Sequence, residues 1–160
     1  MKTQRGFSLI ELLIVVAIIL IIAAIAVPNL LRSRMAANEA SAVGAVRTVT
    51  TAEVTYSTTN PAIGYTDLVT LGGASPCTPS TTTACILDPA ISTAPFIKSG
   101  YTFAAAPTGA QPYETYTVNA NPVTCGSTGL RTFYADTPHV IRYDASAGCP
   151  PAGAASPPLE

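Results

Sequence analysis

Few residues of this chain have side chains that could carry out chemistry. His139 is the single histidine among 160 residues. A Ser-His-Asp or Cys-His arrangement would have to use it, yet it lies in an expected hairpin beside Val140 and Ile141, where we predict a strand-face side chain. No glycine-rich phosphate loop is present. The residue types therefore argue against an enzyme, and we expect no catalytic residue and no cofactor.

The charge balance also limits the kinds of partner. The formal net charge is -1, and only 11% of the residues are charged. Nucleic-acid binding normally needs a basic patch on the protein surface. We therefore expect no nucleic-acid partner.

Four cysteines offer a second kind of chemistry, namely Cys77, Cys85, Cys125 and Cys149. Four cysteines allow three pairings. We prefer Cys77–Cys85 and Cys125–Cys149, because each bridge closes a local loop. Such bridges indicate an oxidising, extracytoplasmic compartment, and free thiols are the alternative. A metal site is not expected, because the cysteine spacings do not suit zinc and His139 is the only histidine in reach.

Glu11 stands inside a strongly apolar stretch. From Phe7 to Leu31, 21 of 25 residues are apolar. As a helix this stretch would be about 37 Å long, enough to cross a hydrocarbon core of about 30 Å. Lys2 and Arg5 precede it, which favours a cytoplasmic N-terminus.

Three interpretations of the stretch compete. A secretory signal peptide could be cut after Ala24-Ile25-Ala26, but a charged residue in its apolar region would be costly. A plain single-pass anchor is the second interpretation. The third gives Glu11 a function.

The first eleven residues of the chain read MKTQRGFSLIE. They resemble the N-termini of type IV prepilins and of the pseudopilins of type II secretion. In these families a short basic leader ends in glycine, and prepilin peptidase cuts after it and methylates the new N-terminal residue, usually phenylalanine. A glutamate follows four residues later. The matching residues here are Gly6, Phe7 and Glu11, and the resemblance continues for about 30 residues to include Pro28.

The resemblance implies roles for these residues. Residues 1–6 would be a leader that is removed, and Phe7 would become N-methylphenylalanine. Glu11 would pair with the N-terminal amine of a neighbouring subunit during assembly, whereas the alternative is a first-turn glutamate that reaches the membrane interface. Pro28 lacks a backbone N–H, so we expect it to kink or locally melt the helix.

The function implied is that of a type IV pilin. The precursor would wait in the bacterial inner membrane, and an assembly platform with its ATPase would polymerise it into an extracellular homo-polymer for adhesion or motility. A type II secretion pseudopilin is the main alternative, and four cysteines with few acidic residues favour a pilin. A single-pass anchored binding module is a remote alternative, which would retain residues 1–6.

The remaining sequence predicts an α+β fold, with one long helix packed on an antiparallel sheet of about four strands. Residues 7–31 form the membrane or filament half of the helix. Residues 32–59 continue it with an apolar stripe, and charged residues such as Glu39 and Glu53 are expected mainly on a solvated face, with contacts between subunits as the alternative. Residues 60–160 form a globular head. Within it we expect loops over 61–99, the sheet over 100–144 and a loose tail over 145–160.

Four strands are predicted within the sheet, because short runs there are rich in aromatic or β-branched residues. Their ranges are 101–106, 113–118, 131–135 and 139–143. The sequence Asp136-Thr137-Pro138 predicts the last turn.

Overall fold

The computed structural model describes residues 7–73 and 76–159 of the chain. The chain divides into two compact units, Met1–Arg34 and Met35–Glu160. The elements are three helices, α1 (Leu9–Thr59), α2 (Leu68–Leu71) and α3 (Pro89–Ser92), and five strands, β1 (Ile97–Lys98), β2 (Tyr101–Thr108), β3 (Thr115–Pro122), β4 (Thr132–Asp136) and β5 (Arg142–Asp144). The predicted α+β class is confirmed, since a long helix packs on an antiparallel sheet.

The long helix α1 ends where the sequence predicts. It spans 51 residues without interruption and stops at Thr59, just before Asn60 and Pro61. Its last turns are rich in threonine, and these hydroxyls donate to carbonyls of the preceding turn, as Thr55 Oγ1 does to Thr51 O at 2.9 Å. Such bonds satisfy the side chain but compete with the backbone for the same acceptors. The helix therefore ends where threonine-rich residues with low helix propensity are followed by Pro61.

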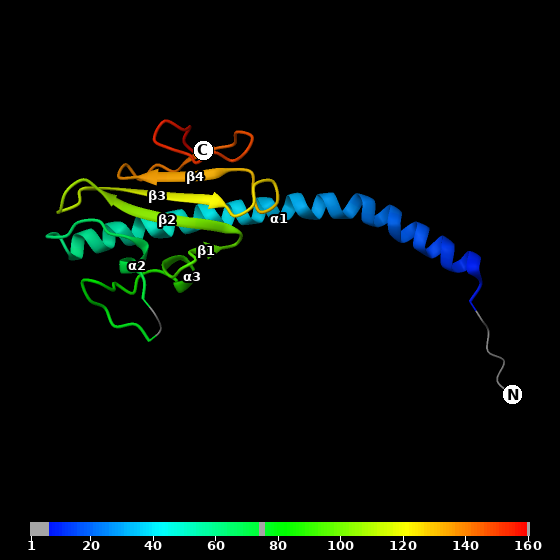
Figure 1. Cartoon of the computed structure of the whole chain (residues 1–160), viewed down its shortest axis with the longest axis horizontal. Helices are drawn as coiled ribbons and strands as arrows, with labels where there is room; N and C mark the ends of the chain where they lie inside the picture. The colour runs from blue at the N-terminus through cyan, green and yellow to red at the C-terminus, as the bar shows by residue number, and fades with distance from the viewer. Residues whose placement is uncertain (1–6, 74–75, 160) are drawn as a thin grey trace. The chain divides into compact units, whose positions relative to one another are not determined.

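The five strands form a simple meander. Their order in the sheet is β1-β2-β3-β4-β5, and every neighbouring pair is antiparallel. The ladder between β2 and β3 is the longest and runs from Tyr101↔Pro122 to Thr108↔Thr115. Figure 1 shows β2, β3 and β4 side by side over the later turns of α1. The sequence missed β1, because a two-residue strand carries no readable alternation.

One face of the sheet packs on the stripe of α1 to form the core of the second unit. Along β2 and β3, buried residues alternate with more exposed ones. The fully buried large side chains include three tyrosines and two phenylalanines, namely Tyr56, Tyr101, Tyr116, Phe103 and Phe133. Small residues such as Ala42 and Ala120 let helix and sheet approach closely.

Two charged residues of α1 lie on the side opposite to the one we predicted. Glu39 is 6% exposed and Glu53 is 0% exposed, so a solvated role for them is wrong. Both carboxylates accept hydrogen bonds from backbone N–H groups of other segments. A pattern of apolar residues does not reveal such partners, because they are distant in sequence.

His139 is not a strand residue. Strand β5 begins only at Arg142, and His139 lies in the preceding turn with a positive φ of 63°. Its N–H donates to Asp136 O at 2.7 Å, which closes the turn predicted at Asp136-Thr137-Pro138. The histidine is exposed and packs edge-on to the Tyr116 ring.

Two short helices organise the region predicted as loops. Asp67 caps α2 by accepting the Thr70 N–H at 2.8 Å. Asp88 caps α3 in the same way, and Pro89 occupies its first turn.

The C-terminal residues are not a loose tail. They run beside β5, where Tyr143 N donates to Pro157 O at 3.0 Å and Leu159 N donates to Ile141 O at 2.7 Å. Thr132 Oγ1 also donates to Pro150 O. Residues 150–159, which we call the C-terminal strap, therefore cover the outer edge of the sheet.

Candidate functional site

The first part of α1 presents an apolar surface that no described residue of its own unit covers. Every large aliphatic side chain described from Leu9 to Leu31 is exposed, from 46% for Val16 to 77% for Leu9. The most apolar window of α1 has a mean hydropathy of 3.3, and none of it is buried. Burying one such side chain is worth roughly 1.5–3 kcal/mol. The segment therefore needs an apolar environment, either lipid or other protein chains.

Glu11 has a local partner at the start of α1. Its Oε2 accepts the backbone N–H of Ser8 at 2.9 Å, while Ser8 O begins the helix by accepting from Leu12 N at 3.2 Å. Ser8 and Glu11 have the spacing of a capping box, a pattern readable from the sequence that our prediction did not use. The Glu11 side chain remains exposed, so a second partner can reach it.

Gly6, Phe7 and Pro28 are the other residues of this segment to which the sequence analysis assigned a role. Gly6 lies outside the described residues, while Phe7 is 83% exposed. Helix α1 continues through Pro28, so the expected local melting is absent from this structure. Asn29 Nδ2 donates to Ile25 O at 3.1 Å, which supports the helix beside the proline. A kink at Pro28 stays a prediction.

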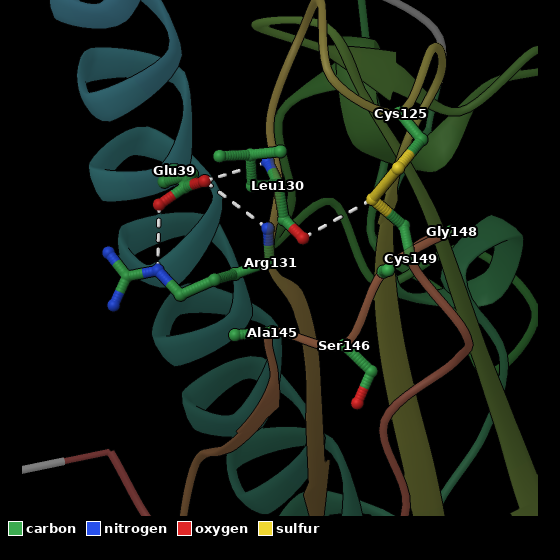
Figure 2. Close-up of a pocket in the computed structure, with 9 residues that line it drawn as sticks. Glu39, Cys125, Leu130, Arg131, Ala145, Ser146, Gly148 and Cys149 are labelled. Carbon is green, nitrogen blue, oxygen red and sulfur yellow. Dashed lines mark hydrogen bonds and ion pairs between the residues drawn. A yellow bond between two sulfur atoms is a disulfide. The ribbon is translucent and has the colours of Figure 1, made fainter.

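In the second unit, Glu39 joins α1 to the start of β4. Its Oε1 accepts the N–H groups of Leu130 at 2.9 Å and Arg131 at 3.2 Å, and its Oε2 accepts Arg131 Nε at 2.7 Å. Figure 2 shows the carboxylate facing these donors. The Arg131 guanidinium also lies 5.9 Å from the Phe133 ring centre and 5.7 Å from that of Tyr143. We call Glu39, Leu130 and Arg131 the Glu39 clamp.

Both preferred cysteine pairs are present in the second unit. The structure contains Cys77–Cys85, eight residues apart, and Cys125–Cys149, 24 residues apart. The second bridge lies beside the Glu39 clamp and lines the same cavity of about 320 Å³ (Figure 2). It therefore ties the loop before β4 to the residues after β5.

The polar side chains discussed above, among the described residues, hold segments of backbone together. In residues 7–73 and 76–159, no group of three or more His, Cys, Asp or Glu side chains could hold a metal ion. The acidic groups Asp88 and Asp144 accept hydrogen bonds at turns, from Ala90 N and Ser146 N. The clamp and both bridges likewise connect segments of backbone.

Comparison with known proteins identifies the first segment. Residues 1–27 match the family described as the prokaryotic N-terminal methylation motif. The N-terminal segment carries this methylation motif. This match includes Gly6, Phe7 and Glu11, so the resemblance seen in the sequence is confirmed.

A curated relative is similar to this chain over a short region. The type IV wide pilus major component PilA4 of Thermus thermophilus is 59% identical over 39 residues. The aligned region covers 24% of this chain and 30% of the relative, so it spans less than a third of that protein. No solved structure matches the chain. Over those 39 residues, the chain is similar to a protein named as a pilus component.

Proposed function

We propose that this chain is a structural subunit that polymerises through the prepilin-type segment of α1 into an extracellular type IV pilus. The observation that carries this proposal is the exposed apolar surface from Phe7 to Leu31, which begins with a methylation motif and contains one carboxylate, Glu11. A chain with this surface needs lipid before assembly and neighbouring helices after it. Because both environments are apolar, transfer between them can be nearly balanced, and an assembly platform with its ATPase can drive it.

Processing would prepare the subunit for assembly. Prepilin peptidase would cut between Gly6 and Phe7 and methylate the new amine, which keeps its ability to carry a positive charge. An amine and a carboxylate 4 Å apart attract each other by about 4 kcal/mol at an effective dielectric constant of 20. The exposed Glu11 carboxylate of one copy could therefore offset the cost of burying its charge by pairing with Phe7 of the next copy. Head-to-tail contacts build a fibre when the rotation between copies does not close a ring, which is what the proposed assembly requires.

The disulfide bridges favour a pilin over a pseudopilin of type II secretion. The Cys77–Cys85 and Cys125–Cys149 bridges strengthen a unit that would face an oxidising exterior. Electron microscopy of surface fibres, together with a protein-secretion assay after gene deletion, separates the two roles. Loss of fibres with normal secretion supports the pilin, and loss of secretion alone supports the pseudopilin.

Sequencing the N-terminus of the mature protein tests the proposal directly. We expect N-methylphenylalanine from Phe7. Retention of residues 1–6 would instead support a single-pass anchored binding module and contradict the proposal.

A Glu11→Ala variant tests the assembly role separately from processing. We expect normal cleavage but few or no filaments, because the neighbouring amine loses its partner. Glu114→Ala is the matched control, since Glu114 is an exposed glutamate of the second unit. Normal filaments from the Glu11 variant would contradict the role of Glu11 in assembly.

A further inference from the structure

Glu53 is a carboxylic acid inside the core of the second unit. Its side chain is 0% exposed. Tyr56 on the next turn of α1 and Tyr116 of β3 belong to the same core, and each is 1% exposed. A carboxylate at such a position loses the hydration that stabilises its charge in water. The hydrogen bonds around it therefore decide which protonation state the fold accepts.

Those hydrogen bonds satisfy only one carboxyl oxygen. Oε2 accepts the backbone N–H of Thr66 at 3.0 Å, and Thr66 immediately precedes Asp67, the cap of α2. Oε1 is buried and has no hydrogen-bond partner among the described residues. A proton on Oε1 removes the charge and leaves Oε2 free to accept the Thr66 N–H. Burial and the unpartnered Oε1 thus favour the neutral acid, whereas the Thr66 N–H by itself favours the anion.

The described groups that act on Glu53 add no positive charge. Asp67 acts on it from the segment before α2, and Glu53 in turn acts on Tyr56 of α1 and Tyr116 of β3. Burial raises the pKa of Glu53 to about 7, which the Thr66 N–H opposes and Asp67 reinforces. Burial also raises the pKa values of Tyr56 and Tyr116 above their usual value of 10, so both stay neutral near pH 7. Ionised Glu53 would therefore be a buried anion beside a second acid.

We propose that Glu53 is a proton-dependent latch, which holds the segment from Asn60 to Gly73 on α1 when protonated and loosens it when ionised. The segment includes Leu68 and Leu71, which are buried in the core, so opening would uncover apolar surface. The latch acts within the second unit and does not depend on the proposed role in pilus assembly.

The direction of the effect follows from the two protonation states. The unfolded chain has the usual glutamate pKa of 4.5, whereas the folded chain has a value of about 7. The stabilisation by the bound proton is complete below pH 4.5 and is lost as the pH rises through about 7. The difference corresponds to a change of roughly 300-fold in the unfolding equilibrium constant between these limits.

Titration of the full-length protein in detergent micelles tests the latch. Carbon-13 NMR of the glutamate carboxyl groups would follow Glu53, whose resonance is assigned by its absence from a Glu53→Gln variant. We expect its midpoint near pH 7. A midpoint near the usual 4.5 would overturn the proposal.

Hydrogen exchange supplies the structural readout. In the wild type, the Thr66 amide should lose protection by about tenfold between pH 6 and pH 8.5, after correction for intrinsic exchange. Glu53→Gln should flatten this dependence, whereas Glu114→Gln, at an exposed position, should retain it. Equal pH dependence in the wild type and a folded Glu53→Gln variant would overturn the latch.

Discussion

At the scale of single residues, the Glu39 carboxylate stabilises the second unit by satisfying three donors. Two are backbone N–H groups of Leu130 and Arg131, and the third is the Arg131 side chain. Hydrogen bonds to a charged group contribute about 1.5–3 kcal/mol each, and donors left without a partner add a desolvation cost. The half-exposed Arg131 side chain reduces the ionic part of this contribution, because water screens it.

We predict that Glu39→Ala lowers the free energy of unfolding by about 2–4 kcal/mol. Denaturant titration of the full-length protein in micelles measures this change. Glu114→Ala should change stability by less than about 0.5 kcal/mol, because that residue is exposed. Equal effects of the two substitutions would refute the clamp.

Gly129 is needed because a buried tyrosine occupies the space beside it. A Cβ at this position would lie 2.0 Å from Tyr101 Oη. Tyr101 is fully buried, and its hydroxyl donates to Arg131 O at 2.7 Å, so the ring cannot move without breaking that bond.

Gly129→Ala should therefore destabilise the protein by about 1–3 kcal/mol through overpacking. Gly153→Ala is the control, since an added Cβ meets no atom within 4 Å there. Thermal unfolding of both variants provides the comparison. A Gly129 variant as stable as the Gly153 variant would show that Tyr101 can relax.

At the scale of elements, the C-terminal strap protects the sheet. Strand β5 has only three residues, and one of its edges is paired by β4. The strap covers the other edge through the bonds of Tyr143 and Leu159, and Arg142 Nη1 donates to Ser156 O at 3.0 Å. An uncovered strand edge is a template for pairing with another chain.

Deletion of residues 155–160 should destabilise β5 and increase non-specific association. Light scattering reports association, and hydrogen exchange of the Tyr143 amide reports the edge, since that amide donates to Pro157 O. A deletion is more informative here than a side-chain substitution, because the strap accepts and donates these bonds through its backbone. Unchanged protection after the deletion would show that the strap is dispensable.

At the scale of the whole molecule, the two units have opposite relations to water. The large aliphatic side chains of the first unit, from Leu9 to Leu31, are exposed. The core of the second unit begins at Ala42 and includes no residue before Met35. The average composition of the chain, 48% apolar, conceals this division.

A chain that begins at Met35 should therefore remain in solution without detergent and unfold cooperatively. The full-length chain should need detergent or lipid under the same conditions. Sedimentation and circular dichroism of the two proteins test this expectation. Aggregation of the shorter chain would mean that the first 34 residues also contribute to folding.

Local patterns in the sequence predicted much of this architecture. The apolar run and the threonine-rich end before Pro61 located α1. Runs of aromatic and β-branched residues located β2, β3 and β4, although β3 extends four residues beyond its predicted end to Pro122. The last strand was predicted to begin at His139, but β5 begins at Arg142. The preferred cysteine pairs also matched, because short loops bring their ends together most readily. The strap was missed, since its bonds come from backbone groups that carry no side-chain signal.

The sequence by itself determined the prepilin-type segment, because a contiguous apolar run with Gly6, Phe7 and Glu11 is readable without any distant contact. Only the tertiary structure decided the environments of Glu39 and Glu53. The partners of Glu39 lie 91 and 92 residues away, and Glu53 meets Thr66 across a turn of the chain. Whether a carboxylate is solvated or buried depends on which backbone donors folding brings to it, and helical periodicity alone does not contain that information.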